Sequence, residues 1–165
     1  MDADYFRLMF EYNKWANDRL LAKAAELSDE DFVKPMGLSM QSVRGVLAHQ
    51  MGFETNWLAR ISGEPPAMSV NQDDYPNAAA MASKWGSVDE KFQAYLKGLT
   101  DEAANSTFSY KNPRGEEMSQ NRGLMLTHVF NHGMQFRSEA GVALSQLGHS
   151  PGDIDLPVFL RESGH

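Results

Sequence analysis

The fold is decided by residues 126–147, LTHVFNHGMQFRSEAGVALSQL. Apolar residues recur in it at spacings of three and four, which predicts one long helix with a stripe facing the core. That stripe consists of Val129, Phe130, Phe136, Ala140, Leu144 and Leu147. His128 and His132 lie along its edge, one turn apart and therefore on the same helical face. Two such imidazoles near a core indicate either neutral side chains hydrogen-bonded to a facing helix or ligands of a metal ion.

Three other segments show the same helical periodicity, so the sequence predicts an all-α protein built as a four-helix bundle. These segments run over residues 2–27, from Ser39 or Ser42 to about Ile61, and over residues 77–99. Asn121 is a suitable N-cap for the last helix, and Gly148 is expected to end it. The proline-bearing residues 65–76 have a length that suits a crossover between helices, so we expect a single domain spanning residues 1–165.

Residues 106–120 depart from the helical pattern. Residues 107–110 alternate, residues 112–115 have the turn sequence NPRG, and residues 116–119 are expected to pair back on the first strand. The sequence thus predicts a small β-hairpin before the last helix, and a lone ribbon of this kind must pack on the helices to be stable. The apolar tail at residues 155–160 is expected to dock on the bundle.

Composition narrows the classes of function. The 165 residues are 42% hydrophobic and 22% charged, as in a soluble globular domain. A net charge of −7 argues against nucleic acid as a partner, because phosphate binding needs a basic surface. The absence of cysteine excludes disulfides, a thiolate nucleophile and a cysteine-based zinc site. No signal peptide and no apolar run of about 20 residues is found, so we expect a cytoplasmic protein without a membrane partner.

Four segments of the chain, in order and at matching spacings, resemble the DinB family. They are residues 13–17 (NKWAN), 42–63 (SVRGVLAHQMGFETNWLARISG), 128–137 (HVFNHGMQFR) and 148–160. The resemblance implies a four-helix bundle with an up-down-down-up arrangement, often present as a homodimer. It also implies a divalent metal, usually zinc or nickel, held by one histidine of the second helix and two of the fourth. Some members of the family are transferases or isomerases that act with a low-molecular-weight thiol.

The resemblance can be transferred residue by residue. His49 matches the ligand of the second helix, and His132 matches the first ligand of the fourth. The family pattern in the fourth helix continues, two residues after Asn-His, with His-His-Arg-Gly-Gln, whereas this chain has the sequence QFRSE at residues 135–139. Phe136 therefore stands at the position of the third ligand. Because a phenyl ring has no lone pair to donate, the usual triad of histidines cannot form.

Three residues are candidates to complete a metal site with His49 and His132. Gln135 offers only an amide oxygen, which is a poor ligand for zinc. Glu139 lies two helical turns beyond His132 and would have to reach back. His128 is the best donor type, and its use would shift the metal by one turn along the helix.

Two functional hypotheses follow. The first is a metal-dependent transferase or hydrolase in which the metal lowers the pKa of a bound water or thiol. The second is a member without metal, in which the histidines hydrogen-bond with Asn56 or Gln135. Such a protein would bind a small ligand or serve as a structural dimer. In both cases the predicted pocket is lined by Asn56, Phe53, Gln135, Phe136 and Glu139.

Overall fold

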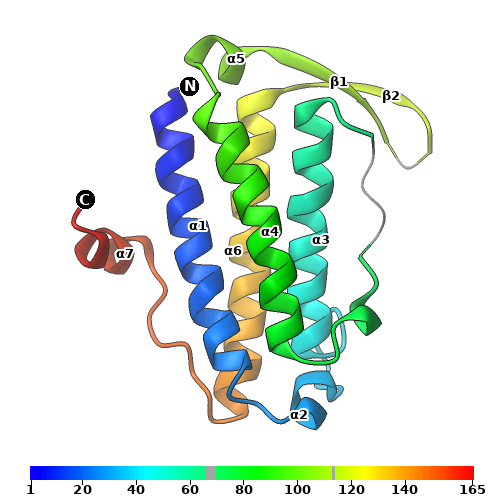
Figure 1. Cartoon of the computed structure of the whole chain (residues 1–165), viewed down its shortest axis with the longest axis vertical. Coiled ribbons are helices and arrows are strands. Elements are labelled where there is room, and N and C mark those ends of the chain that lie inside the picture. The colour runs from blue at the N-terminus through cyan, green and yellow to red at the C-terminus, as the bar shows by residue number, and fades with distance from the viewer. Residues whose placement is uncertain (66–69, 113) are drawn as a thin grey trace.

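The computed structural model describes residues 1–65, 70–112 and 114–165 and shows a bundle of four long helices (Figure 1). These are α1 (Ala3–Ala24), α3 (Val43–Ser62), α4 (Ala78–Lys97) and α6 (Arg122–Gln146). In Figure 1, α1 and α6 run downward, whereas α3 and α4 run upward. The predicted all-α fold with its up-down-down-up arrangement is therefore confirmed, and the crossover joins the two parallel helices α3 and α4.

The sequence determines where each long helix begins, because each N-cap side chain accepts a hydrogen bond from a backbone N–H of the first turn. The caps are Asp2 for α1, Ser42 for α3, Asn77 for α4 and Asn121 for α6. Of the two serines considered for α3, it is thus Ser42 that caps the helix. Gly63 ends α3 with a φ of 73°, a left-handed conformation that glycine adopts without strain.

Shorter elements connect or flank the long helices. They are α2 (Asp29–Val33), η1 (Gln72–Asp74), α5 (Asp101–Asn105), β1 (Thr107–Lys111), β2 (Glu117–Asn121) and α7 (Leu156–Ser163). The strands pair antiparallel, which confirms the predicted hairpin. It packs on α3 as expected, with the ring of Tyr110 at 5.4 Å from that of Trp57. The predicted crossover at residues 65–76 contains η1, and its residues 66–69 lie outside the described residues.

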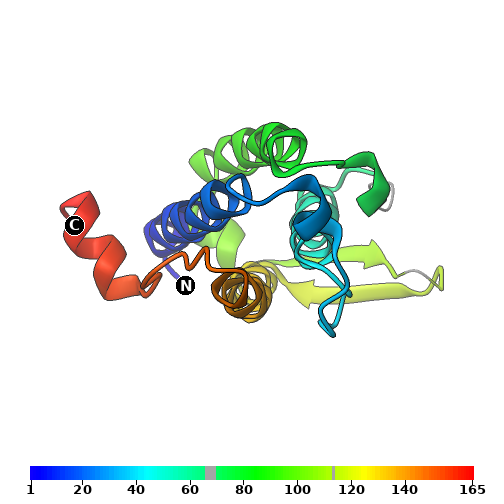
Figure 2. The ribbon, with the colours of Figure 1, turned by 90° about the horizontal axis from the view of Figure 1, so that it is seen from below.

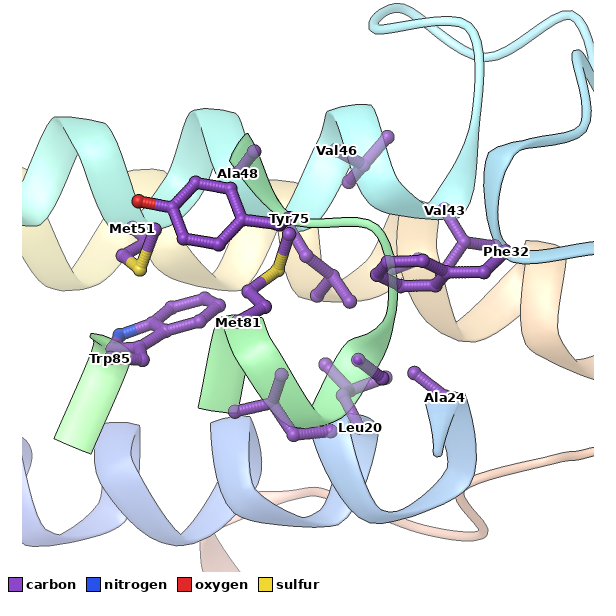
Figure 3. Close-up of a cluster of buried hydrophobic side chains, with 14 of the residues drawn as sticks. Leu20, Ala24, Phe32, Val43, Val46, Ala48, Met51, Tyr75, Met81 and Trp85 are labelled. Carbon is purple, nitrogen blue, oxygen red and sulfur yellow. The ribbon is translucent and has the colours of Figure 1, made fainter. Parts of the chain in front are cut away.

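Each long helix packs against two neighbours: α1 and α3 each contact both α4 and α6 (Figure 2). Apolar side chains from α1, α2, α3 and α4 meet at the lower end of the bundle (Figure 3). This cluster includes Leu20, Phe32, Val43, Met51, Met81 and Trp85, each at most 1% exposed. Fully burying a large apolar side chain contributes roughly 1.5–3 kcal/mol, so this cluster is a major source of stability.

The C-terminal tail docks on the bundle, as expected, and folds there as α7. Phe159 is 4% exposed, and its ring lies 5.9 Å from Tyr12 and 5.7 Å from Trp15 of α1. The Trp15 indole N–H also donates a hydrogen bond to Glu162. Within the described part of the chain, no helix has both the length and the hydropathy that crossing a bilayer requires.

Candidate functional site

The site lies where α3 and α6 pack together. His49 of α3 and His132 of α6 are far apart in sequence, yet their Nε2 atoms are 3.3 Å apart. The two rings are half-buried, and their centroids are separated by 5.2 Å. The structure therefore brings together the two histidines that the sequence singled out.

Phe136 lies against both imidazoles. Its ring centroid is 4.4 Å from that of His49 and 4.5 Å from that of His132. The side chain is buried, with 6% of its surface exposed. An aromatic hydrocarbon thus occupies the place beside the pair where the family resemblance implies a third donor.

The second face of His132 is covered by Phe53. The two rings are nearly parallel, with an interplanar angle of 5° and centroids 3.3 Å apart. The Nδ1 atom of His132 is buried and has no hydrogen-bond partner among the described residues. A metal-ligating histidine almost always donates its other ring N–H to a second group that orients the ring. Within the described ranges, no residue gives His132 this support.

The other predicted donors do not join the pair. His128 is exposed, and its ring centroid lies 6.2 Å from that of His132. Its ring makes T-shaped contacts with Phe53 and Trp57, at centroid distances of 5.3 and 5.7 Å. Gln135 is exposed as well. Asn56 donates its side-chain N–H to the carbonyl oxygen of Gly52, one turn earlier in its own helix.

Glu139 contacts Ser39 in the loop before α3. Its carboxylate accepts hydrogen bonds from the backbone N–H of Ser39, at 2.5 Å, and from the hydroxyl of the same residue, at 2.6 Å. This carboxylate therefore ties the loop that precedes α3 to α6. It also acts on the site through space, because its negative charge opposes the lowering of the pKa of His49.

Burial keeps both imidazoles neutral at pH 7. It lowers the pKa of His132 to about 4, and the neighbouring His49 and His128 lower it further in the same sense. Burial also lowers the pKa of His49, against the opposing charge of Glu139. A neutral imidazole has one N–H donor and one nitrogen acceptor, so the pair can either share a hydrogen bond or present lone pairs to a ligand.

A cavity of about 360 Å³ opens beside His49. Its lining is uncharged and comes from the loop before α3, the start of α3 and the segment around η1: Ser39, Met40, Gln41, Gly45, Ala48, His49, Val70, Asn71 and Gln72. Gly45 is required here because a Cβ atom at this position would lie 1.9 Å from the carbonyl oxygen of Met40. Cavities that hold small ligands in proteins have volumes of about 300–1,000 Å³.

A second polar cluster lies on the inner side of α3 and α6, and the sequence analysis did not identify it. Glu54 is 2% exposed, and its carboxylate accepts four hydrogen bonds. The donors are the side chains of Asn13, Asn17, Gln50 and Trp85. The guanidinium of Arg137, 2% exposed, donates to the amide oxygens of Asn13 and Asn17. The two asparagines thus bridge a buried cation and a buried carboxylate.

Close helix contact makes this cluster possible. A Cβ atom at Gly133 of α6 would lie 2.7 Å from the Asn13 amide oxygen and 2.8 Å from Arg137, so a larger residue would displace them. Asp89 of α4 lies at the edge of the cluster, 3.9 Å from the ammonium of Lys14. Burial and the nearby carboxylate of Glu54 raise the pKa of Asp89 to about 7.

The donor set was tested against the metal that the family resemblance implies. Two nitrogen ligands of tetrahedral zinc are about 3.4 Å apart, given Zn–N bonds of about 2.0–2.1 Å, and the pair has a matching separation of 3.3 Å. However, the residues described include no group of three or more histidine and carboxylate side chains placed to hold one ion. Among the described residues, His49 and His132 thus supply one edge of a tetrahedral site, whereas catalytic zinc sites have three protein ligands.

Comparisons with known proteins agree with the fold. The chain matches the DinB family over residues 1–164. It is 23% identical over 165 residues to Protein DinB of Bacillus subtilis, a match that covers 96% of this chain and 95% of that protein. A crystal structure of a conserved protein from Enterococcus faecalis has a similar fold, with a TM-score of 0.64 at 10% identity. That similarity covers 87% of this chain and 96% of the other.

Proposed function

Since the chain belongs to the DinB family, we propose that it is a member that binds a small molecule beside a histidine pair and keeps no resident metal. The observation that carries this proposal is the position of Phe136. Its ring packs at 4.4 and 4.5 Å against the two imidazoles, where the family resemblance implies the third ligand. Catalytic zinc sites use three protein ligands, and two neutral imidazoles supply one ligand fewer, so the pair alone is expected to hold zinc weakly.

The surroundings of His132 support the same proposal. Its Nδ1 atom, which has no partner in the part of the chain that the structure describes, and its stacking on Phe53 suit an imidazole that packs as an aromatic ring. A strong metal ligand would need a partner for that nitrogen. The site thus retains the two histidines of the family pattern in surroundings that favour their neutral, metal-free form.

The cavity beside His49 provides the space for a ligand. Its lining offers amide groups, a hydroxyl and one neutral imidazole, together with apolar surface from Met40, Ala48 and Val70. These groups can donate and accept hydrogen bonds without supplying a formal charge. The ligand class that fits best is therefore a small neutral molecule bearing a hydroxyl, amide or thiol group.

Elemental analysis of protein purified without a polyhistidine tag tests the metal part of the proposal. We expect well under one equivalent of zinc or nickel after dialysis against a weak chelator. The variant Phe136→His is expected to retain close to one equivalent, because it restores a third imidazole. Phe136→Leu is the matched control, since it removes the ring without adding a donor. One equivalent of tightly held metal in the wild-type protein would contradict the proposal.

Ring signals of ¹⁵N-labelled histidines test the binding part. A panel of small alcohols, amides and thiols is titrated into the metal-free protein. At least one probe is expected to shift the signals of His49 and to leave in place those of His149 and His165, which do not line the cavity and instead contact Glu26 and Glu11. The variant Ala48→Phe, which fills the cavity from its own wall, should abolish the response. A panel that moves no His49 signal would count against ligand binding.

A second candidate rests on the 3.3 Å separation of the two Nε2 atoms, which suits one edge of a tetrahedral metal site. In this case a divalent metal would bind to His49 and His132 only when a small thiol supplies further ligands. Zinc affinity measured with and without an added monothiol distinguishes the two candidates. A large gain in affinity with the thiol, lost in His132→Ala, would favour the second candidate over the first.

A further inference from the structure

A groove of about 560 Å³ lies between α1 and α4, which run antiparallel beside one another (Figure 1). None of the described residues that line it belongs to the histidine pair, to the cavity beside His49 or to the buried polar network. Its floor is apolar, since Phe10 is 4% exposed and Leu96 2%. The ring of Phe10 stacks on that of Phe92 with centroids 5.2 Å apart, which joins the two helices at this level. Ligand sites in proteins have volumes of about 300–1,000 Å³, so the groove is large enough for a small molecule.

Contacts between the two helices fix their register. The Nε atom of Arg7 donates to the carbonyl oxygen of Leu96 at 3.1 Å, and Lys14 lies 3.9 Å from Asp89. Because the helices run antiparallel, each step toward the C-terminus of α1 corresponds to a step toward the N-terminus of α4. Residues near position 97 are therefore level with Arg7, and residues near position 90 are level with the turn of α1 that contains Lys14.

In this register the charged residues along the groove are sorted by sign. Arg7 and Lys97 lie at one end, whereas Glu11 and Glu90 lie toward the other. At a rise of 1.5 Å per residue, the residues of opposite charge are separated by about 6 Å along α1 and about 10 Å along α4. Among the described residues, neither Lys97 nor Glu90 forms an ion pair. The groove thus offers a positive end and a negative end with an apolar floor between them.

Contacts within the chain hold Arg7 in place at the positive end. Its Nη2 atom donates to the carbonyl oxygen of Leu99 at 2.6 Å, in addition to the bond from Nε to Leu96, and Nη1 donates to Asp4. A guanidinium has five N–H donors, so two remain for a further acceptor. The side chain is 34% exposed and can be reached from the groove. A fixed guanidinium suits a carboxylate, because it donates parallel N–H bonds and loses little side-chain entropy on binding.

We propose that this groove binds short zwitterionic peptides of two or three residues, with the C-terminal carboxylate beside Arg7 and Lys97 and the N-terminal ammonium beside Glu90. An extended chain spans about 3.3–3.6 Å per residue, so two or three residues cover about 7–10 Å, which matches the separation of the two ends. A free amino acid carries both charges within one residue and reaches only one end. An apolar side chain on the peptide covers the floor of the groove and is stabilised there by leaving water. This site is independent of the histidine pair.

NMR titration of the ¹⁵N-labelled full chain tests the proposal, with alanyl-leucine and trialanine as the probes. Both are expected to bind with dissociation constants of about 1 mM and to shift the amide signals of residues 7–11 and 90–97. Free alanine, N-acetylated trialanine and trialanine amide are the matched controls, since each lacks either the length or one of the two charges. Each control is expected to bind about fivefold more weakly than trialanine.

Lys97→Gln and Glu90→Gln test the orientation of the peptide. Lys97→Gln should weaken the binding of trialanine about three- to fivefold and leave that of trialanine amide unchanged, because the amide has no carboxylate. Glu90→Gln should weaken trialanine by a similar factor and leave N-acetylated trialanine unchanged. Lys84→Gln is the control, since Lys84 is exposed on α4 outside the groove. Glu11 is kept intact because its Oε2 atom lies 3.3 Å from Nε2 of His165.

Three results would overturn the proposal. A wild-type protein whose amide signals stay in place with about 10 mM of either peptide does not bind them in this groove. Derivatives without one charge that bind as tightly as trialanine show that the charged ends are not recognised. A loss in Lys97→Gln that is equal for trialanine and its amide contradicts the orientation of the carboxylate. Circular dichroism of each variant separates loss of binding from loss of folding.

Discussion

The polar side chains on the inner side of the α3–α6 pair are joined by many hydrogen bonds, whereas those on the outer side make few. Each side has a buried atom without a partner among the described residues, Gln50 Oε1 inside and His132 Nδ1 outside. His49 and Gln50 are consecutive on α3, yet Gln50 points into a network in which Glu54 accepts four hydrogen bonds. His49 instead meets His132, whose buried Nδ1 atom has no partner among the described residues. The difference predicts that the inner network contributes more to the stability of the bundle than the histidine pair does.

Removing Glu54 should have the largest effect. In Glu54→Ala, Arg137 remains buried without its bridged carboxylate, and breaking a buried pair of this kind costs about 3–5 kcal/mol. Urea denaturation is expected to show this loss in the free energy of unfolding. Glu90→Ala, an exposed glutamate on α4, is the control and should change it by less than about 0.5 kcal/mol.

The double variant Glu54→Leu/Arg137→Leu sharpens the same experiment. Replacing both charges by apolar residues leaves neither of them buried alone, so it should cost less than Glu54→Ala does. If the double variant is instead as unstable as the sum of its two single variants, the charges of the network contribute independently. The bridge through Asn13 and Asn17 would then not couple them.

Asp89 gives the next largest effect and makes stability depend on pH. Its pKa is about 7 in the folded chain against 3.8 as the ordinary value, so folding favours the protonated form. The contribution of Asp89 to the free energy of unfolding is therefore greatest below about pH 4. It falls as the pH rises to 7 and then levels off. Asp89→Asn removes that loss. The variant should be more stable than the wild type at pH 8, by at most about 4 kcal/mol, and the gain should shrink toward pH 5.

Thermal unfolding of both proteins from pH 5 to pH 8 measures this difference. Glu90→Gln is a suitable control because Glu90 is an exposed carboxylate on the same helix. A gain in Asp89→Asn that is equal at both ends of the range would show that the carboxylate is not the titrating group.

Much of the fold could be predicted from sequence because apolar spacing and cap residues are local signals. Asn121 and Ser42 begin their helices in the structure as their residue types indicate. The helical form of α7 was not predicted. The expected tail of residues 155–160 is too short for periodicity to separate a helix from an extended strand.

The inner network had only a faint signal in the sequence. Asn13 and Gln50 interrupt apolar stripes, which is how a buried polar residue first becomes visible. Glu54 and Arg137 gave no such sign, because a charged residue on a helix is expected to face water. The absence of the third histidine of the family pattern could be predicted from the sequence, because Phe136 stands at its position. Whether His128 converges on the pair depends on how α3 and α6 pack, and spacing within one helix does not fix that.

On the outer side, substitution of His132 should destabilise the protein far less than substitution of Glu54. His132→Leu replaces a neutral ring, one of whose nitrogens has no partner among the described residues, by an apolar side chain. His49 loses its 3.3 Å contact with His132, but it is only half-buried and can hydrogen-bond with water instead. The free energy of unfolding is expected to change by less than about 1 kcal/mol in urea denaturation. A loss as large as that in Glu54→Ala would mean that the pair is as much a part of the scaffold as the network.

The smallest effect concerns the electrostatic link between Glu139 and His49. The carboxylate opposes the lowering of the pKa of His49 that burial causes. Glu139→Gln keeps an acceptor for Ser39 but removes the charge, so the pKa of His49 should fall further. Titration of the His49 ring signals by NMR measures the change, and Glu117→Gln on the hairpin serves as the control. An unchanged titration would show that the Ser39 contact confines the influence of Glu139 to the loop, and the histidine pair would then be set by burial alone.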